Sequence, residues 1–172
     1  MKKLAWTFLL ASLCCSPSFA QQTNKVATFA RNALMGRSEE IVAATVEMPA
    51  DKFGFRPSPD QMTFGQLTLH VADGNYIYCS RIGGVPEPQR PNLSDTDAKD
   101  KLVQRLQASF AFCTAALAKL DDSGMSETLI FGPTKTPRSM AILTLTGTWT
   151  DHLSMQTTYL QANGLMPSTA KK

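Results

Sequence analysis

The stretch Ser94–Leu120, SDTDAKDKLVQRLQASFAFCTAALAKL, decides the fold of this 172-residue chain. Its apolar residues recur at spacings of 3, 4, 3, 4 and 3, at Val103, Leu106, Phe110, Cys113, Leu117 and Leu120. That period is typical of helices that pack at a shallow angle in a bundle. Ser94, followed by Asp95 and Asp97, suits a helix start because acidic side chains favour the positive end of the helix dipole. We therefore expect a bundle helix over residues 94–120.

Two further helices are indicated before this stretch. Residues 24–47 carry apolar side chains at helical spacing until Pro49 stops the pattern. Thr63 followed by Gln66 forms a capping box, in which each side chain satisfies a free backbone N–H at the helix start. The pair Gly83-Gly84 ends this second helix, since glycine tolerates the left-handed conformation that closes many helices.

The fourth helix is expected to use Thr136 as its cap and Pro137 in its first turn, and to end at Gly164. No alternating run of convincing length predicts a strand. Four helices with one apolar stripe each predict an all-α fold, a four-helix bundle. The connections are long enough for a crossover as well as for hairpins, so the pattern alone leaves the helix order open.

Residues 1–20 have the pattern of a secretory signal peptide. Lys2 and Lys3 precede an apolar run that reaches Cys15, and the small residue Ala20 suits cleavage before Gln21. The run is shorter than the roughly 20 apolar residues that span a bilayer. Cleavage leaves residues 21–172, enough chain for one compact domain. We expect export to the periplasm or the medium, with no membrane span in the mature protein.

The net charge and the cysteine content bear on the expected partners and on disulfide formation. Removing the two signal-peptide lysines lowers the formal net charge from +3 to +1, so nothing favours nucleic acid as a partner. Cys79 and Cys113 are the two cysteines that remain, and an oxidising compartment would favour a disulfide between them. The alternative is two buried thiols that act as small apolar residues.

Only two histidines occur in the chain, His70 and His152, each midway along a predicted helix. Imidazole is the commonest metal ligand at neutral pH, and it also titrates there. On ideal helices His70 lies near Asp73, and His152 shares a side with Thr148. We expect the two imidazoles to line one pocket, although zinc-type sites usually recruit three or four protein donors.

Two blocks of this sequence resemble the DinB-like proteins and together cover nearly all of the mature chain in the right order. The first is Met48-Pro49 through Phe55-Arg56-Pro57-x-Pro59, then Thr63-Phe64-Gly65-x-Leu67-x-x-His70-Val71-Ala72-Asp73. The second is Trp149-x-Asp151-His152, then Gln156 and Tyr159-Leu160-x-x-Asn163-Gly164-Leu165-Met166-Pro167. The resemblance implies a four-helix bundle with its helices ordered up, down, down and up.

The resemblance also implies a divalent metal, such as zinc or nickel, held by one histidine of the second helix and two of the fourth, spaced His-x-x-x-His. His70 matches the first position and His152 the last, but Thr148 stands at the middle one. Three interpretations remain open. Asp73 supplies a third ligand; or the metal is held weakly with extra waters, one anchored by Thr148; or the metal is lost and the histidines serve structure.

Two functions of different class follow from these interpretations. The resemblance implies an exported metal-dependent hydrolase or transferase, in which metal-bound water or thiolate would react. The alternative is a noncatalytic exported bundle that binds a small ligand or a protein partner in the cleft where relatives hold metal. Homodimers are common in the family, so a second copy is a further expected partner. The sequence leaves open whether the protein is an enzyme.

Overall fold

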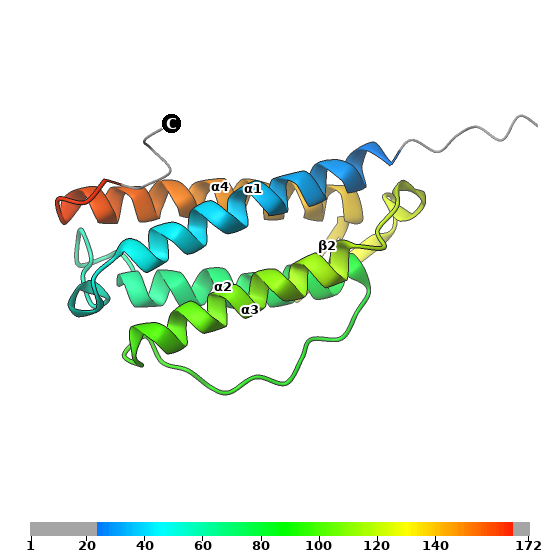
Figure 1. Ribbon diagram of the computed structural model, residues 1–172. Helices are drawn as coiled ribbons and strands as arrows, with labels where there is room; N and C mark the ends of the chain where they lie inside the picture. The colour runs from blue at the N-terminus through cyan, green and yellow to red at the C-terminus, as the bar shows by residue number, and fades with distance from the viewer. Residues whose placement is uncertain (1–23, 167–172) are drawn as a thin grey trace, which may run out of the picture.

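The computed structural model describes residues 24–166, so the predicted signal peptide, residues 1–20, lies outside the described residues. The fold is built from four helices, α1 (Lys25–Glu47), α2 (Phe64–Gly83), α3 (Lys99–Leu117) and α4 (Arg138–Ala162). Short 3-10 turns occupy Ala50–Lys52 and Asp122–Gly124. The helices pack as one elongated bundle (Figure 1). The expected all-α four-helix bundle is confirmed.

The helices run up, down, down and up, as the resemblance implied. α1 and α4 point in one direction and α2 and α3 in the other (Figure 1). Within the bundle α1 lies beside α4 and α2 lies beside α3, so the closest pairs are parallel. Parallel neighbours need a connection as long as the bundle, and residues 84–98 supply it by running back from the end of α2 to the start of α3.

The expected start of α2 and the expected ends of α2 and α4 are confirmed. The Thr63 hydroxyl accepts a hydrogen bond from the Gln66 backbone N–H at 3.1 Å, and the Gln66 side chain accepts one from the Thr63 N–H at 2.8 Å. This reciprocal capping box fixes where α2 begins. Gly84 closes α2 with φ of 64°, and Gly164 follows the end of α4 with φ of 72°.

The expected start of the third helix at Ser94 is wrong. α3 begins at Lys99, because residues 94–97 form a turn in which the Asp97 carboxylate accepts from the Ser94 N–H at 2.9 Å. The Asp95 carboxylate accepts from the Thr63 hydroxyl at 3.2 Å instead of facing a helix start. Polar residues that resemble helix caps therefore tie the crossover to the beginning of α2. The helix also ends at Leu117, three residues before Leu120.

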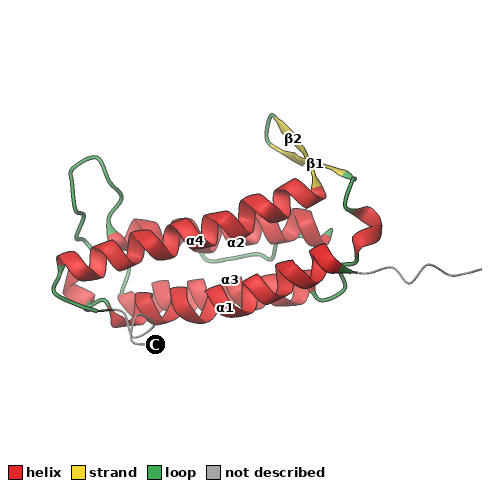
Figure 2. Cartoon of the chain, turned by 90° about the horizontal axis from the view of Figure 1, so that it is seen from above, coloured by secondary structure: helices red, strands yellow, loops and turns green. Residues whose placement is uncertain are grey.

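The expectation of no strand is also wrong. A β-hairpin pairs β1 (Thr128–Phe131) with β2 (Thr134–Pro137) in antiparallel register, around Gly132 with its φ of 56°. Figure 2 shows the hairpin at one end of the bundle. Thr136 and Pro137, expected to open the fourth helix, lie instead in β2 opposite β1, so α4 begins at Arg138.

A disulfide and a hydrogen-bonded chain cross the core between helices. Cys79 of α2 and Cys113 of α3 are joined in a disulfide, and both residues are fully buried. The Asn75 amide, also in α2, accepts from the Trp149 indole N–H at 2.7 Å and donates to the Ser109 hydroxyl at 3.0 Å. These links join α2 to both α3 and α4.

Within residues 24–166 no helix is long and apolar enough to cross a membrane.

Candidate metal centre

The two histidines lie side by side, one on α2 and the other on α4. The ring centroids of His70 and His152 are 5.0 Å apart, and the ring planes are nearly perpendicular at 88°. His70 is exposed on the bundle surface, whereas only 8% of His152 is exposed. The pair therefore forms a small polar site between α2 and α4 that is exposed to solvent at His70.

Hydrogen bonds on either side of His152 hold α4 against α2. One turn earlier, the Trp149 indole donates to Asn75 of α2. Two turns later, the Tyr159 hydroxyl donates to the carbonyl oxygen of Met62, just before α2 begins, at 2.7 Å. Because both side chains are almost fully buried, these bonds fix the height and rotation of α4 at the level of the two imidazoles.

The surroundings keep the His152 imidazole neutral near pH 7. Burial lowers the pKa of His152, the neighbouring charge of His70 lowers it further, and Asp151 opposes the shift. Burial disfavours the charged form of a base because the interior solvates an ion poorly. A neutral imidazole keeps the ring lone pair that a metal ion requires.

Asp73 does not join the histidines. Its carboxylate lies 3.4 Å from the guanidinium of Arg105 in α3, on the side of α2 that faces that helix. Among residues 24–166 no three histidine, cysteine, aspartate or glutamate side chains gather closely enough to share an ion. In this structure Asp73 is thus paired with Arg105 rather than grouped with the two imidazoles.

Thr148 lies one turn before His152 and is half-buried. Its hydroxyl donates to the Thr144 carbonyl oxygen at 2.6 Å, which commits its only proton to the helix backbone. The oxygen keeps lone pairs that would accept a proton from a bound water.

The structure brings two imidazole donors together here, with their ring centroids 5.0 Å apart. These two rings would hold a divalent ion, which would supply Lewis-acid chemistry when bound. With Asp73 paired to Arg105, the remaining positions would fall to water or to a small ligand.

Gln156, one turn after His152 on α4, contacts α1. Its amide nitrogen donates to the Thr45 hydroxyl at 2.7 Å, and that hydroxyl donates to the Ile41 carbonyl oxygen at 2.8 Å. Since the Thr45 proton is already committed, only the nitrogen of Gln156 can face it. The buried Gln156 oxygen has no hydrogen-bond partner within the described part of the chain.

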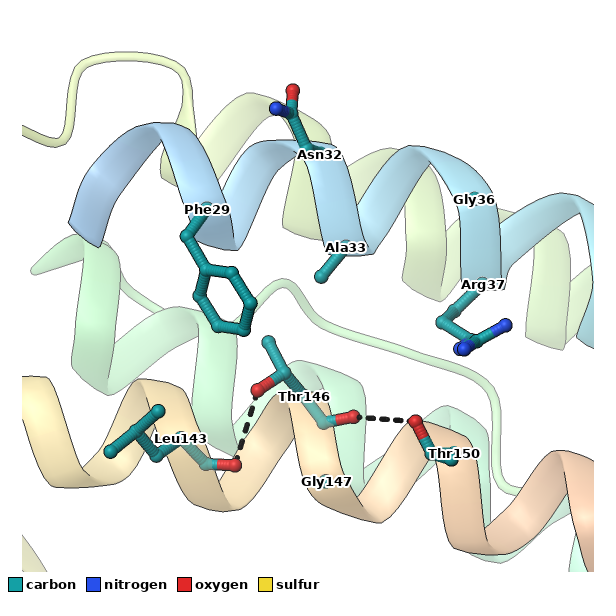
Figure 3. A pocket seen from close by; sticks show the side chains of 9 residues that line it. All are labelled: Phe29, Asn32, Ala33, Gly36, Arg37, Leu143, Thr146, Gly147 and Thr150. Carbon is teal, nitrogen blue, oxygen red and sulfur yellow. Dashed lines mark hydrogen bonds between the residues drawn. The ribbon is translucent and has the colours of Figure 1, made fainter. Parts of the chain in front are cut away.

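A separate groove of about 480 Å³ lies between α1 and α4. Figure 3 shows Phe29 pointing from α1 toward α4, near Leu143 and Thr146. Arg37 is the one charged side chain in its lining, and it pairs with Glu40. The lining contains no histidine, cysteine or carboxylate, so this groove offers no side chain for acid–base chemistry or for holding a transition metal.

A second cluster of polar side chains, which the sequence analysis did not anticipate, lies under the crossover. Tyr76, Arg90 and Arg105 converge there from α2, the crossover and α3. The tyrosine lies on an apolar stripe, while the arginines are separated by an irregular loop, so no periodicity links them. A signal did exist in the proline-rich segment PEPQRP at residues 86–91, which predicts an extended chain lying over the helices.

Comparisons with known proteins agree with this architecture. Three solved structures are similar: DinB-like proteins from Bacillus subtilis (12% identity, TM-score 0.66) and Bacillus cereus (15%, 0.65), and a conserved protein from Enterococcus faecalis (14%, 0.64). The alignments cover 79%, 80% and 80% of this chain, and 92%, 93% and 96% of those chains, respectively. At these identities the likeness shows the fold alone. No curated protein matches the sequence.

The family assignment comes from the sequence. The family model of the DinB superfamily matches residues 35–155, which is more than half of the chain and includes both His70 and His152. The resemblance drawn from the two sequence blocks is thereby confirmed. This chain belongs to the DinB superfamily.

Proposed function

We propose that this protein is an exported DinB-superfamily bundle that binds a divalent metal ion, zinc or nickel, through His70 and His152. Water or a small ligand would complete the shell. The observation that carries the proposal is the 5.0 Å spacing of the two imidazole centroids, one on α2 and the other on α4. Export is supported by the signal-peptide pattern of residues 1–20.

The environment of each ring supports this role. The lowered pKa of His152 keeps its imidazole unprotonated near neutral pH, and the exposure of His70 gives an ion a route from solvent. A bound divalent ion would act as a Lewis acid on a water or a substrate oxygen, the chemistry of a hydrolase or transferase. The residues of this chain would hold the ion, and Thr148 would orient a neighbouring water.

The test is a calorimetric titration of untagged mature protein, residues 21–172, with zinc and with nickel after chelator treatment. Because the chain has only two histidines, their ring proton signals in NMR report directly on binding. One equivalent of metal should bind and shift both sets of signals. His70→Ala and His152→Ala should each weaken binding at least tenfold, or about 1.4 kcal/mol.

Asp73→Asn is the matched control, since it removes a carboxylate three residues from His70 whose partner is Arg105. It should leave metal affinity unchanged. Metal that binds equally well to both histidine variants, or no saturable binding to the parent protein, would refute the proposal.

A second candidate function is a noncatalytic bundle that binds a small ligand in the same groove without metal. It is favoured by two observations: the Thr148 hydroxyl is committed to Thr144, and Asp73 is committed to Arg105. Both leave the histidine pair short of the three donors that catalytic zinc sites use. Absence of metal binding in the titration above would favour this alternative.

A further inference from the structure

A cleft of about 730 Å³ lies between the crossover and the outer faces of α2 and α3. Its volume is within the range of small-molecule sites, roughly 300–1,000 Å³. Tyr76 of α2 borders it, six residues after His70 and therefore about 120° further round the helix. The cleft is thus a site apart from the histidine pair, and the following inference is independent of metal binding.

Three cations and one carboxylate line the cleft. The cations are Arg90 on the crossover and Lys101 and Arg105 on α3, and the carboxylate is Asp97. Asp97 accepts from Lys101 at 3.1 Å, and Glu87, outside the lining, accepts from Arg90 at 3.0 Å. Lys101 is 62% exposed, so solvent screens its pair, whereas Arg90 and Glu87 are only 23% and 31% exposed. Each cation nevertheless has N–H donors that its carboxylate does not use. The lining therefore remains rich in donors for an anion.

Arg105 is the best-placed of these donors. Its side chain is only 9% exposed, yet its carboxylate partner Asp73 is half exposed and lies 3.4 Å away. A second nitrogen of the guanidinium donates to the Pro91 carbonyl oxygen and so anchors the crossover. A guanidinium carries five N–H donors, and a buried one is costly unless a close anion balances its charge. Asp73 supplies that balance only partly.

The rest of the cleft is aromatic and apolar. The Tyr76 and Phe112 rings lie 5.4 Å apart, and the Arg90 guanidinium covers Tyr76 at 4.2 Å from the ring centroid. Burial raises the pKa of Tyr76, while Arg105 and Arg90 pull it down, so both cations act at the phenol. The Arg90 guanidinium therefore lies directly against the apolar surface that Tyr76 and Phe112 form.

We propose that the cleft beneath the crossover binds a small organic anion, with its carboxylate or phosphate at Arg90, Lys101 and Arg105 and its apolar or aromatic body against Phe112. Bidentate pairing of guanidinium with such groups is strong and directional. The Tyr76 and Phe112 rings favour a ligand that has an apolar body over an inorganic anion that has none. The site needs neither histidine.

The experiment is an NMR titration of the mature protein with three probes: benzoate, which has both features, inorganic phosphate, which lacks the ring, and benzyl alcohol, which lacks the charge. Benzoate should bind saturably, at least about fivefold tighter than either of the others. Backbone shifts should gather on residues 88–93 and on the α3 residues that line the cleft.

Two pairs of variants locate the site. Arg90→Gln should weaken benzoate binding at least about fivefold, whereas Arg81→Gln, an exposed arginine of α2 outside the cleft, should not. Ala108→Trp fills the cleft and should abolish binding. Gln107→Trp adds the same bulk at an exposed neighbouring position that does not line the cleft, and should leave binding intact.

Several outcomes would overturn the inference: no saturable benzoate binding, equal binding by phosphate or benzyl alcohol, or benzoate binding unchanged in Arg90→Gln and Ala108→Trp. Circular dichroism of each variant checks the fold. If Ala108→Trp fails to fold, the Arg90→Gln and Arg81→Gln pair still decides the result. Benzoate affinity in His70→Ala, which should equal that of the parent, keeps this test separate from metal binding.

Discussion

Gly83 of α2 lies so close to Ala116 of α3 that a methyl group added to Gly83 would be 2.5 Å from the Ala116 carbonyl oxygen. Real Cβ atoms do not approach backbone this closely. The absence of a side chain at Gly83 therefore allows the two parallel helices to meet at their carboxyl ends. The Cys79–Cys113 disulfide joins the same pair of helices one turn earlier on α2.

Gly83→Ala should lower the free energy of unfolding by about 1–3 kcal/mol, because α2 must move away from α3 to admit the methyl group. Gly74→Ala is the matched control on the same helix, since a Cβ there would meet no atom within 4 Å. That change should raise the unfolding free energy by about 0.4–1 kcal/mol through loss of freedom in the unfolded chain. Urea unfolding followed by circular dichroism measures both, and equal effects would contradict the close approach.

Removing the disulfide should destabilise the protein. The cysteines are 34 residues apart, and a cross-link closing a loop of this length stabilises by about 3–4 kcal/mol in the chain-entropy treatment. Unfolding in urea with and without a thiol reductant should show this loss. The double variant Cys79→Ala, Cys113→Ala should be insensitive to reductant, and a parent protein that is equally insensitive would count against the cross-link.

Asn75→Ala should cost about 2–4 kcal/mol of unfolding free energy. The change strands the Trp149 indole N–H in the core and also leaves a cavity. Ser109→Ala removes the acceptor for the Asn75 amide N–H and a donor to the Leu106 carbonyl oxygen, but it leaves the indole bond intact, so its cost should be about 1 kcal/mol. Costs in the opposite order would show that the indole contact adds little.

Stability should fall on mild acidification because the pKa of His152 is lowered in the folded protein. Well above the ordinary pKa of 6.5, His152 is neutral in both the folded and the unfolded states. As the pH falls, the unfolded chain takes up a proton at His152 before the folded protein does. The unfolding free energy should therefore decrease from about pH 6.5 downward until the folded-state pKa is passed. His152→Gln should flatten this slope below about pH 6.5, measured in urea with chelator present. An unchanged slope in His152→Gln would mean that other titratable groups cause the pH dependence.

Thr148→His restores an imidazole one turn before His152, next to the His70–His152 pair. If the groove keeps the spacing described above, zinc affinity should rise at least tenfold, or about 1.4 kcal/mol. Thr144→His, placed one further turn away on the same helix at an exposed position, is the control and should give a smaller gain. Calorimetry compares the two, and an equal gain would mean that any added imidazole suffices.

Local signals in the sequence determined the helix ends that were predicted correctly. Thr63 and Gln66 satisfy each other within one turn, and Gly84 and Gly164 adopt left-handed backbone, so neighbouring residues alone fix these boundaries. The start of α3 was missed because Asp95 bonds to Thr63, 32 residues away. The partner of Asp73 is Arg105, which is also 32 residues away. A residue pattern along one helix cannot predict such a contact between two helices.

The hairpin escaped prediction for a different reason. Leu129 is its one buried strand residue, while Ile130 and most of its partners face solvent, so four-residue strands show too little alternation to detect. Thr136 and Pro137 also have the residue types of a helix start, and only their pairing with β1 reveals otherwise. The juxtaposition of His70 and His152 could be expected, because both lie on predicted bundle helices at the flank of apolar stripes.

The histidine pair is divided between α2 and α4, and the whole of α3 separates these two helices along the chain. Neither imidazole has the other as a neighbour until α4 has docked against α2. Any ligand that needs both rings would therefore bind only the assembled bundle, and loss of α4 by proteolysis would abolish the site.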